Sequence, residues 1–140
     1  MQMVNKHPIA IAQLRGDREH MGLRGAVRFY QLPGGILVET DVVGLKGNGF
    51  FDIRICEGTD PLRLNLPEGF CECRPGAGEL PPILSCNGKS YSTVMTDRFS
   101  IREILGRRVE ICEISGQRPY ERPEKSVAWG AVEKSSPGRR

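Results

Sequence analysis

Short segments of alternating apolar and polar residues, separated by glycine- and proline-containing turns, constrain the fold of this chain most strongly. In the stretch GFFDIRICEG at 49–58, Phe51, Ile53 and Ile55 alternate with polar residues. A period of two places successive side chains on opposite faces of a strand. Six or seven such segments predict an antiparallel sandwich or barrel. The others lie at 9–15, 25–32, 36–43, 90–96, 107–112 and 127–132.

Three further stretches depart from this alternation. LPGG at 32–35 is a hairpin turn signal. Ser100 stands three residues before Glu103, which is a capping box, and apolar residues follow with helical spacing. We therefore predict one short helix at 100–105. The stretch 57–88 is rich in proline and glycine, and we expect it to be irregular.

The bulk composition excludes several classes of protein. The chain has 140 residues, which is the length of one domain. Its net charge is only +3. We expect this domain to span 1–132, followed by a disordered basic tail at 133–140. The sequence has no basic stripe with interleaved aromatic residues, which argues against nucleic-acid binding. No window of the sequence approaches the roughly 20 apolar residues that a membrane span needs. The first residues make a poor secretory signal, so we expect a cytoplasmic protein.

The cysteine and histidine content limits the possible sites. Five cysteines, an odd number, argue against a full disulfide framework in a reducing compartment. The only histidines are His7 and His20, and we expect both to be exposed. We find no arrangement of side chains for nucleophilic catalysis and no phosphate-binding loop. The cysteines are Cys56, Cys71, Cys73, Cys86 and Cys112.

Several fragments, occurring in the right order, together resemble the bacterial copper/zinc superoxide dismutases. They cover most of 9–132, and LPPILS followed by TDRFSIREILGRRV is the most specific. The resemblance implies a flattened, eight-stranded Greek-key β-barrel, with two long loops that build a copper and a zinc site outside the barrel. The other fragments are LRGAVRFYQLPGGILVETDVVGL, GAGELPPILS and SVAWGAV.

The positions that the resemblance assigns to copper carry no histidine. Arg54 and Cys56 stand in place of the His-x-His pair of the family strand, and Cys112 stands in place of the third copper histidine. The histidine that bridges the two metals in the family falls near Leu64 or Asn65. Because no histidine follows His20, no other alignment restores these ligands.

The other functional positions of the family have also changed. The two further zinc histidines match Cys73 and Gly76, and the zinc aspartate matches Glu79. The family disulfide and the arginine that attracts superoxide are replaced as well. The residues at those positions are Pro61 and Trp129 for the disulfide and Ser126, beside Lys125, for the arginine. We expect Trp129 to fill the space of the lost disulfide.

These replacements favour a dismutase homologue without dismutase activity, which acts as a binding or structural module and needs no cofactor. Thiolates stabilise Cu(I), so copper held by cysteines would resist the redox cycling that the family reaction needs. A homodimer is compatible with this interpretation, and no protein partner is indicated. The family label would instead imply an active superoxide dismutase.

A thiolate site is the alternative. Cys56, Cys73 and Cys112 stand at family ligand positions, Glu79 could add an oxygen, and Cys71 lies nearby. Cu(I) or Zn(II) would suit such donors. Against this, C-x-C is not a zinc-knuckle spacing, and the thiols could be remnants of an unused site.

A redox role is a further alternative for the same strands. Cys56 and Cys112 would form a reversible disulfide if their Cα atoms lay within about 7 Å. Arg54 would then lower a thiol pKa. In the simpler interpretation, which we favour, Arg54 pairs with Asp52, Glu57 or Glu110.

Overall fold

The computed structural model describes residues 7–56, 79–113 and 126–135. These residues form eight antiparallel strands and one short helix, so the predicted all-β class is confirmed. The elements are β1 Ala10–Gly16, β2 Arg24–Leu32, β3 Gly35–Val43, β4 Gly49–Cys56, β5 Glu79–Ser85, β6 Lys89–Thr96, α1 Ile101–Ile104, β7 Arg108–Glu113 and β8 Ser126–Lys134.

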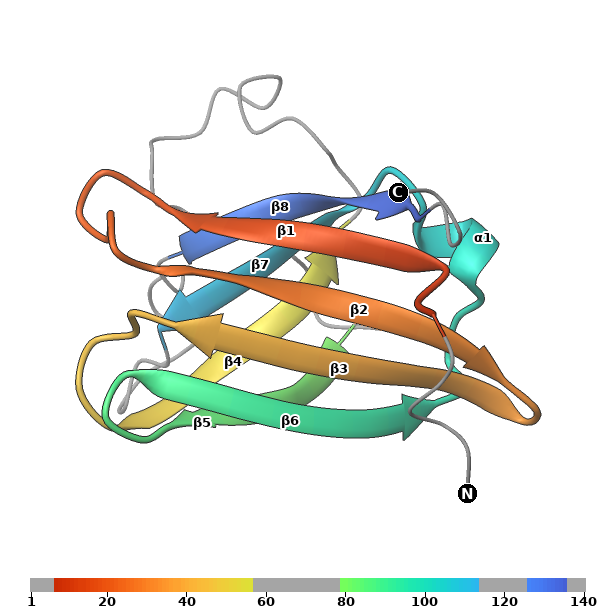
Figure 1. The fold of residues 1–140 in the computed structure, drawn as a ribbon, viewed down its shortest axis with the longest axis horizontal. Coiled ribbons are helices and arrows are strands. Elements are labelled where there is room, and N and C mark those ends of the chain that lie inside the picture. The colour runs from red at the N-terminus through yellow and green to blue at the C-terminus, as the bar shows by residue number, and fades with distance from the viewer. Residues whose placement is uncertain (1–6, 57–78, 114–125, 136–140) are drawn as a thin grey trace, which may run out of the picture.

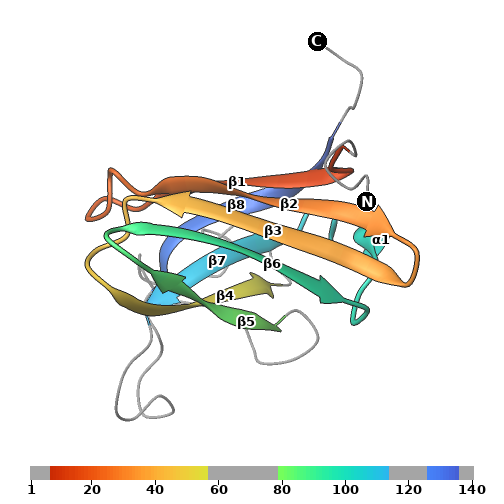
Figure 2. The same cartoon turned by 60° about the horizontal axis from the view of Figure 1, so that its bottom comes forward.

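The strands form one sheet that curls into a nearly closed barrel. Their order is β5-β4-β7-β8-β1-β2-β3-β6. In Figure 2, β1, β2, β3 and β6 form one layer, which lies over a second layer of β8, β7, β4 and β5. The two end strands, β5 and β6, lie close together, and the turn closed by the Cys86–Lys89 bridge joins the end of β5 to the start of β6. Figure 1 shows the two layers crossing at an angle.

The alternating residues build the core as predicted. Phe51, Ile53 and Ile55 of β4 are buried in one hydrophobic cluster. Phe99, just before the helix, packs edge-on against Phe29 of β2, with 6.5 Å between the ring centroids. The short helix therefore closes over one end of the barrel interior, and the polar members of each strand are left on the outer face.

The local signals for a turn and a helix are also confirmed. Pro33 and Gly34 make a two-residue loop between β2 and β3, and Gly34 takes the positive φ of 89° that glycine adopts without strain. The Ser100 side chain accepts from the Glu103 backbone amide, and the Glu103 side chain accepts from the Ser100 amide. This reciprocal capping box starts α1 within the predicted range.

The strand β5 corrects the prediction that 57–88 is irregular throughout. Its prolines, Pro81 and Pro82, argued against a strand because proline donates no ladder hydrogen bond. They are accommodated because β5 is an end strand of the sheet and the register shifts beside them. Phe51 lies opposite Ile83, and Ile53 lies opposite Leu80, so the two prolines occupy the irregular step.

The expected end of the domain and the expected exposure of His20 both differ from the structure. β8 continues through Lys134, two residues beyond the expected boundary at 132. His20 is buried rather than exposed, and the carboxylate of Asp17, 2.6 Å from its Nδ1, gives the buried ring a polar partner. Within the described ranges, no helix is long and apolar enough to cross a membrane.

Candidate functional site

The outer face of β4 and β7 is where the resemblance places the copper site. The register sets Cys56 opposite Arg108, Arg54 opposite Glu110, and Asp52 opposite Cys112. The intervening residues, such as Ile53 and Ile111, point into the core. The three opposed pairs therefore share the outer face of the two strands. The sequence correctly predicted that Cys56 and Cys112 lie on the same side.

Opposite charges alternate around this face. Arg54 donates to Asp52 along β4 over 3.0 Å, and Arg108 forms an ion pair with Glu110 along β7 over 2.6 Å. The pairing of Arg54 with a neighbouring acid, which we favoured, is confirmed. Because Arg54 also stands directly opposite Glu110, positive and negative groups alternate along and across the strands. Two guanidinium groups and two carboxylates balance one another there.

Burial makes the β7 pair unusual. The Arg108 side chain is fully buried and that of Glu110 is 3% exposed. Burying a charged side chain costs its hydration free energy, so a buried charge needs an oppositely charged partner. The Arg108 guanidinium also lies 5.8 Å from the ring centroid of Trp129, within cation–π range. Trp129 is 39% exposed, so it covers an arginine on the outer face rather than filling the core.

The cysteines of this face do not meet. Cys112 stands opposite Asp52, four residues from Cys56, so the two cysteines are separated by roughly 13 Å along the strands. Cys56 is disulfide-bonded, whereas the buried Cys112 is not part of a disulfide. The alternative of a reversible Cys56–Cys112 disulfide, which required Cα atoms within about 7 Å, therefore does not hold in this structure. The Cys112 sulfur instead lies 4.0 Å from a Glu110 carboxylate oxygen.

Most other predicted ligand positions cannot be placed. Glu79, the first residue of β5, lies opposite Arg54 in the ladder. Ser126, at the position of the family's guiding arginine, is buried and lies opposite Cys112. The remaining positions fall outside the described residues. They are Pro61, Leu64, Asn65, Cys71, Cys73, Gly76 and Lys125.

The described side chains do not fit a copper centre of the dismutase kind. In the described ranges, no three histidine, cysteine or acidic side chains are grouped so that they could hold a metal. The disulfide-bonded sulfur of Cys56 is not a thiolate ligand. A metal cation on this face would be repelled by two guanidinium groups and would compete with them for Asp52 and Glu110.

A second polar cluster, on the outer face of β2, β3 and β6, was missed by sequence reasoning. Glu39 accepts hydrogen bonds from Tyr30 over 2.9 Å, from Arg28 over 3.2 Å and from Tyr91 over 2.5 Å. Burial raises the pKa of Glu39, but these three hydrogen bonds outweigh it and leave the pKa below its ordinary value. The turn at 32–35 already implied part of this cluster, because counting back from it places Arg28 opposite Glu39.

Comparisons with known proteins do not assign a family. No protein-family model matches the chain, and no curated protein matches it.

Proposed function

We propose that this chain is a superoxide dismutase-like protein in which ion pairs stand where the family has its copper site. In this proposal it has no dismutase activity and acts as a binding or structural module. The strand order supports a Greek-key barrel of that family, because β4 pairs with β7 and β3 pairs with β6, both across long intervening segments. The fragments that carry the resemblance fall largely on regular elements of the barrel.

The observation that carries the proposal is the pairing of Arg54 and Arg108 with acidic partners on the outer face of β4 and β7. Arg54 stands at a family copper-ligand position, and guanidinium groups remain protonated at every accessible pH. They therefore cannot act as metal ligands. Their carboxylate partners are the groups that would otherwise attract a cation to this face.

Metal loading followed by activity measurement tests the proposal. The reduced protein is incubated with Cu(II) and Zn(II), freed of loose metal, and examined for metal content and for superoxide dismutation. We expect a rate no higher than that of an equal amount of protein-free copper carried through the same steps. Rapid turnover that follows the bound copper would overturn the proposal.

The thiolate alternative, a Cu(I) or Zn(II) site on cysteines, is a second candidate. It is favoured by the burial of the Cys112 sulfur beside the Glu110 carboxylate, on the face to which family copper belongs. The candidate donors are Cys112, Cys73 and Glu79, with Cys71 near them in sequence. Cys56 would join them only after its disulfide is reduced.

The same loaded protein separates the two candidates by metal content. About one equivalent of zinc or copper, lost in the Cys56→Ser/Cys112→Ser variant and kept in Cys86→Ser, would establish the thiolate site and overturn the non-metal proposal. The Cys86 thiol is exposed and lies in the β5–β6 turn, so Cys86→Ser is a matched control. Metal below a tenth of an equivalent would support the ion-pair interpretation.

A further inference from the structure

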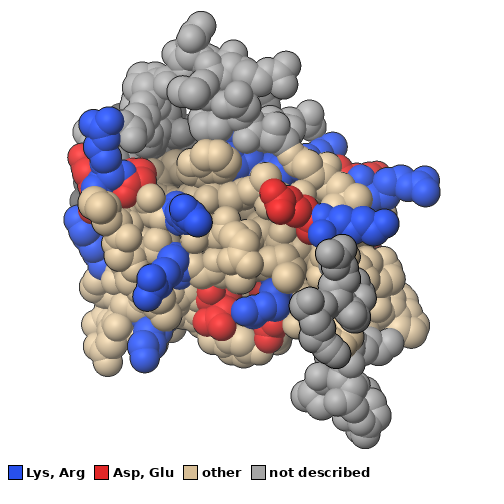
Figure 3. All heavy atoms as spheres, turned by 45° about the horizontal axis from the view of Figure 1, so that its top comes forward, with Lys and Arg blue, Asp and Glu red and all other residues tan. Residues whose placement is uncertain are grey.

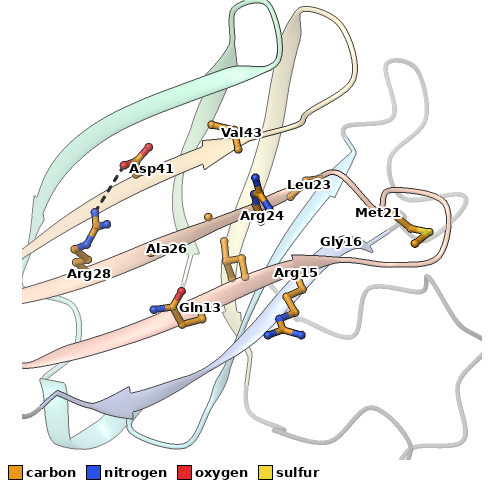
Figure 4. A pocket seen from close by; sticks show the side chains of 12 residues that line it. Gln13, Arg15, Gly16, Met21, Leu23, Arg24, Ala26, Arg28, Asp41 and Val43 are labelled. Atoms are coloured by element: carbon orange, nitrogen blue, oxygen red, sulfur yellow. Dashed lines mark ion pairs between the residues drawn. The ribbon is translucent and has the colours of Figure 1, made fainter.

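A hollow of about 760 Å³ opens on the outer face of β1, β2 and β3, on strands other than those of the β4–β7 face. Ala26 forms a small, 6% exposed floor, and Gln13 of β1 and Asp41 of β3 stand opposite it on either side. Figure 4 shows these side chains together with the arginines around them. The volume is within the usual range for small-molecule sites.

Three arginines surround this floor and differ in their partners. Arg28 is held by Glu39 over 3.2 Å and by Asp41 over 3.9 Å. In the described part of the chain, Arg15 and Arg24 form no ion pair. Both line the hollow, and their positive charges have no acidic partner among the described residues.

Arg15 and Arg24 are directly opposed across β1 and β2. Both point to the outer face, because Leu14 and Val27 occupy the core side of the same strands. Like charges in directly opposed positions of a sheet repel each other and destabilise the pairing. In Figure 4 the two side chains splay apart. An anion between them would convert this repulsion into two attractive contacts.

Basic and acidic side chains lie together around this end of the barrel. Figure 3 shows Lys and Arg side chains toward the β1–β2 connection with Asp and Glu side chains beside them, and further Lys and Arg side chains at the opposite end. The attraction for an anion therefore comes from the two opposed arginines rather than from the charge of the whole face.

We propose that this hollow binds a phosphoryl group, held between Arg15 and Arg24 with a hydrogen bond from the Gln13 amide. A guanidinium group presents a planar fork of donors that suits two oxygens at once. A terminal phosphoryl group offers three oxygens, so both forks can bind it by sharing one oxygen, whereas a carboxylate offers only two. The site does not depend on whether the β4–β7 face binds metal.

Titration with inorganic pyrophosphate at low ionic strength tests the site, with amide chemical shifts as the readout. We expect the shifts to concentrate at β1 and β2 and to saturate. Arg15→Gln and Arg24→Gln should each weaken binding about tenfold, since each removes a charge-assisted contact. Arg15→Lys/Arg24→Lys, which keeps the charge but loses the forks, should also weaken it.

Arg102→Gln is the matched control, because Arg102 is exposed and lies on α1, away from the hollow. If Arg102→Gln weakened pyrophosphate binding as much as the Arg15 and Arg24 variants do, the loss would be due to overall charge and the proposed site would be overturned. Absence of saturable shifts would overturn it as well. Citrate, which carries carboxylates instead of phosphoryl groups, should bind at least tenfold more weakly. Equal affinity for citrate would overturn the phosphoryl assignment.

Discussion

Arg108 and Glu110 stand two residues apart on β7 and form an ion pair of 2.6 Å with almost no exposure to water. Such a pair contributes little net stability compared with apolar side chains of similar size, because both charges lose their hydration. Breaking it is costly, since the remaining charge stays buried without its partner. Replacing one partner of the pair should therefore lower the stability of the fold strongly, whereas replacing both with apolar residues of similar size should lower it little.

Replacing Glu110 with alanine should lower the free energy of unfolding by about 3–5 kcal/mol, because Arg108 would lose its buried counter-charge. The double variant Arg108→Met/Glu110→Leu should recover most of that loss. Urea unfolding measures both. Glu113→Gln, at the exposed end of β7, should change stability by less than about 0.5 kcal/mol. A double variant as unstable as the single one would show that the ion pair is not the cause.

Acid should remove the contribution of Glu39 to stability. The pKa of this carboxyl is below its ordinary value of 4.5, so the folded protein binds its proton more weakly than the unfolded chain. The contribution is therefore complete above pH 4.5 and is lost as the pH falls through the folded pKa. Glu39→Gln should be less stable than wild type by about 1 kcal/mol at pH 7.

Unfolding curves for wild type and Glu39→Gln between pH 7 and pH 2.5 check this dependence. The difference in stability between them should shrink as the pH falls below 4.5. Glu133→Gln, an exposed glutamate of β8, should show no comparable trend. A constant difference down to pH 2.5 would contradict the proposed role of the Glu39 charge.

Local pattern predicted most of the barrel because each strand carries its own alternation. The alternation of Phe51, Ile53 and Ile55 with polar residues predicts which face of the strand is buried, even when its partner strands are unknown. Ser100 and Glu103 likewise form their capping box within four residues. β5 was missed because Pro81 and Pro82 are tolerated only at a sheet edge and a register shift, and both depend on tertiary structure.

The site was less predictable than the fold. The ion pair of Arg54 and Asp52 follows from their spacing of two along one strand. The separation of Cys56 from Cys112 depends on how β4 aligns with β7, a pairing across more than fifty residues that alternation alone leaves undetermined. Complete burial of Arg108 was also unpredictable, because it follows from the packing around β7 rather than from its own sequence.

Loss of the Ser100 side chain should weaken the start of the helix. Ser100→Ala removes the acceptor for the Glu103 amide and should lower the free energy of unfolding by about 1 kcal/mol. Ser100→Asp, which keeps an acceptor at the same position, should retain most of the stability. Thermal unfolding measures the three proteins, and equal destabilisation by alanine and aspartate would contradict the capping role.

The close approach of β8 to β1 should depend on Gly130. A Cβ atom at this position would lie 1.8 Å from the Gln13 carbonyl oxygen, which is backbone and cannot rotate away. Gly130→Ala should therefore force the two strands apart and lower the free energy of unfolding by about 2 kcal/mol or more. Gly22→Ala is the matched control, because a Cβ there meets nothing within 4 Å. It should change stability by less than about 0.5 kcal/mol in urea unfolding. Equal stability of the two variants would mean that β1 and β8 tolerate a wider spacing than the structure shows.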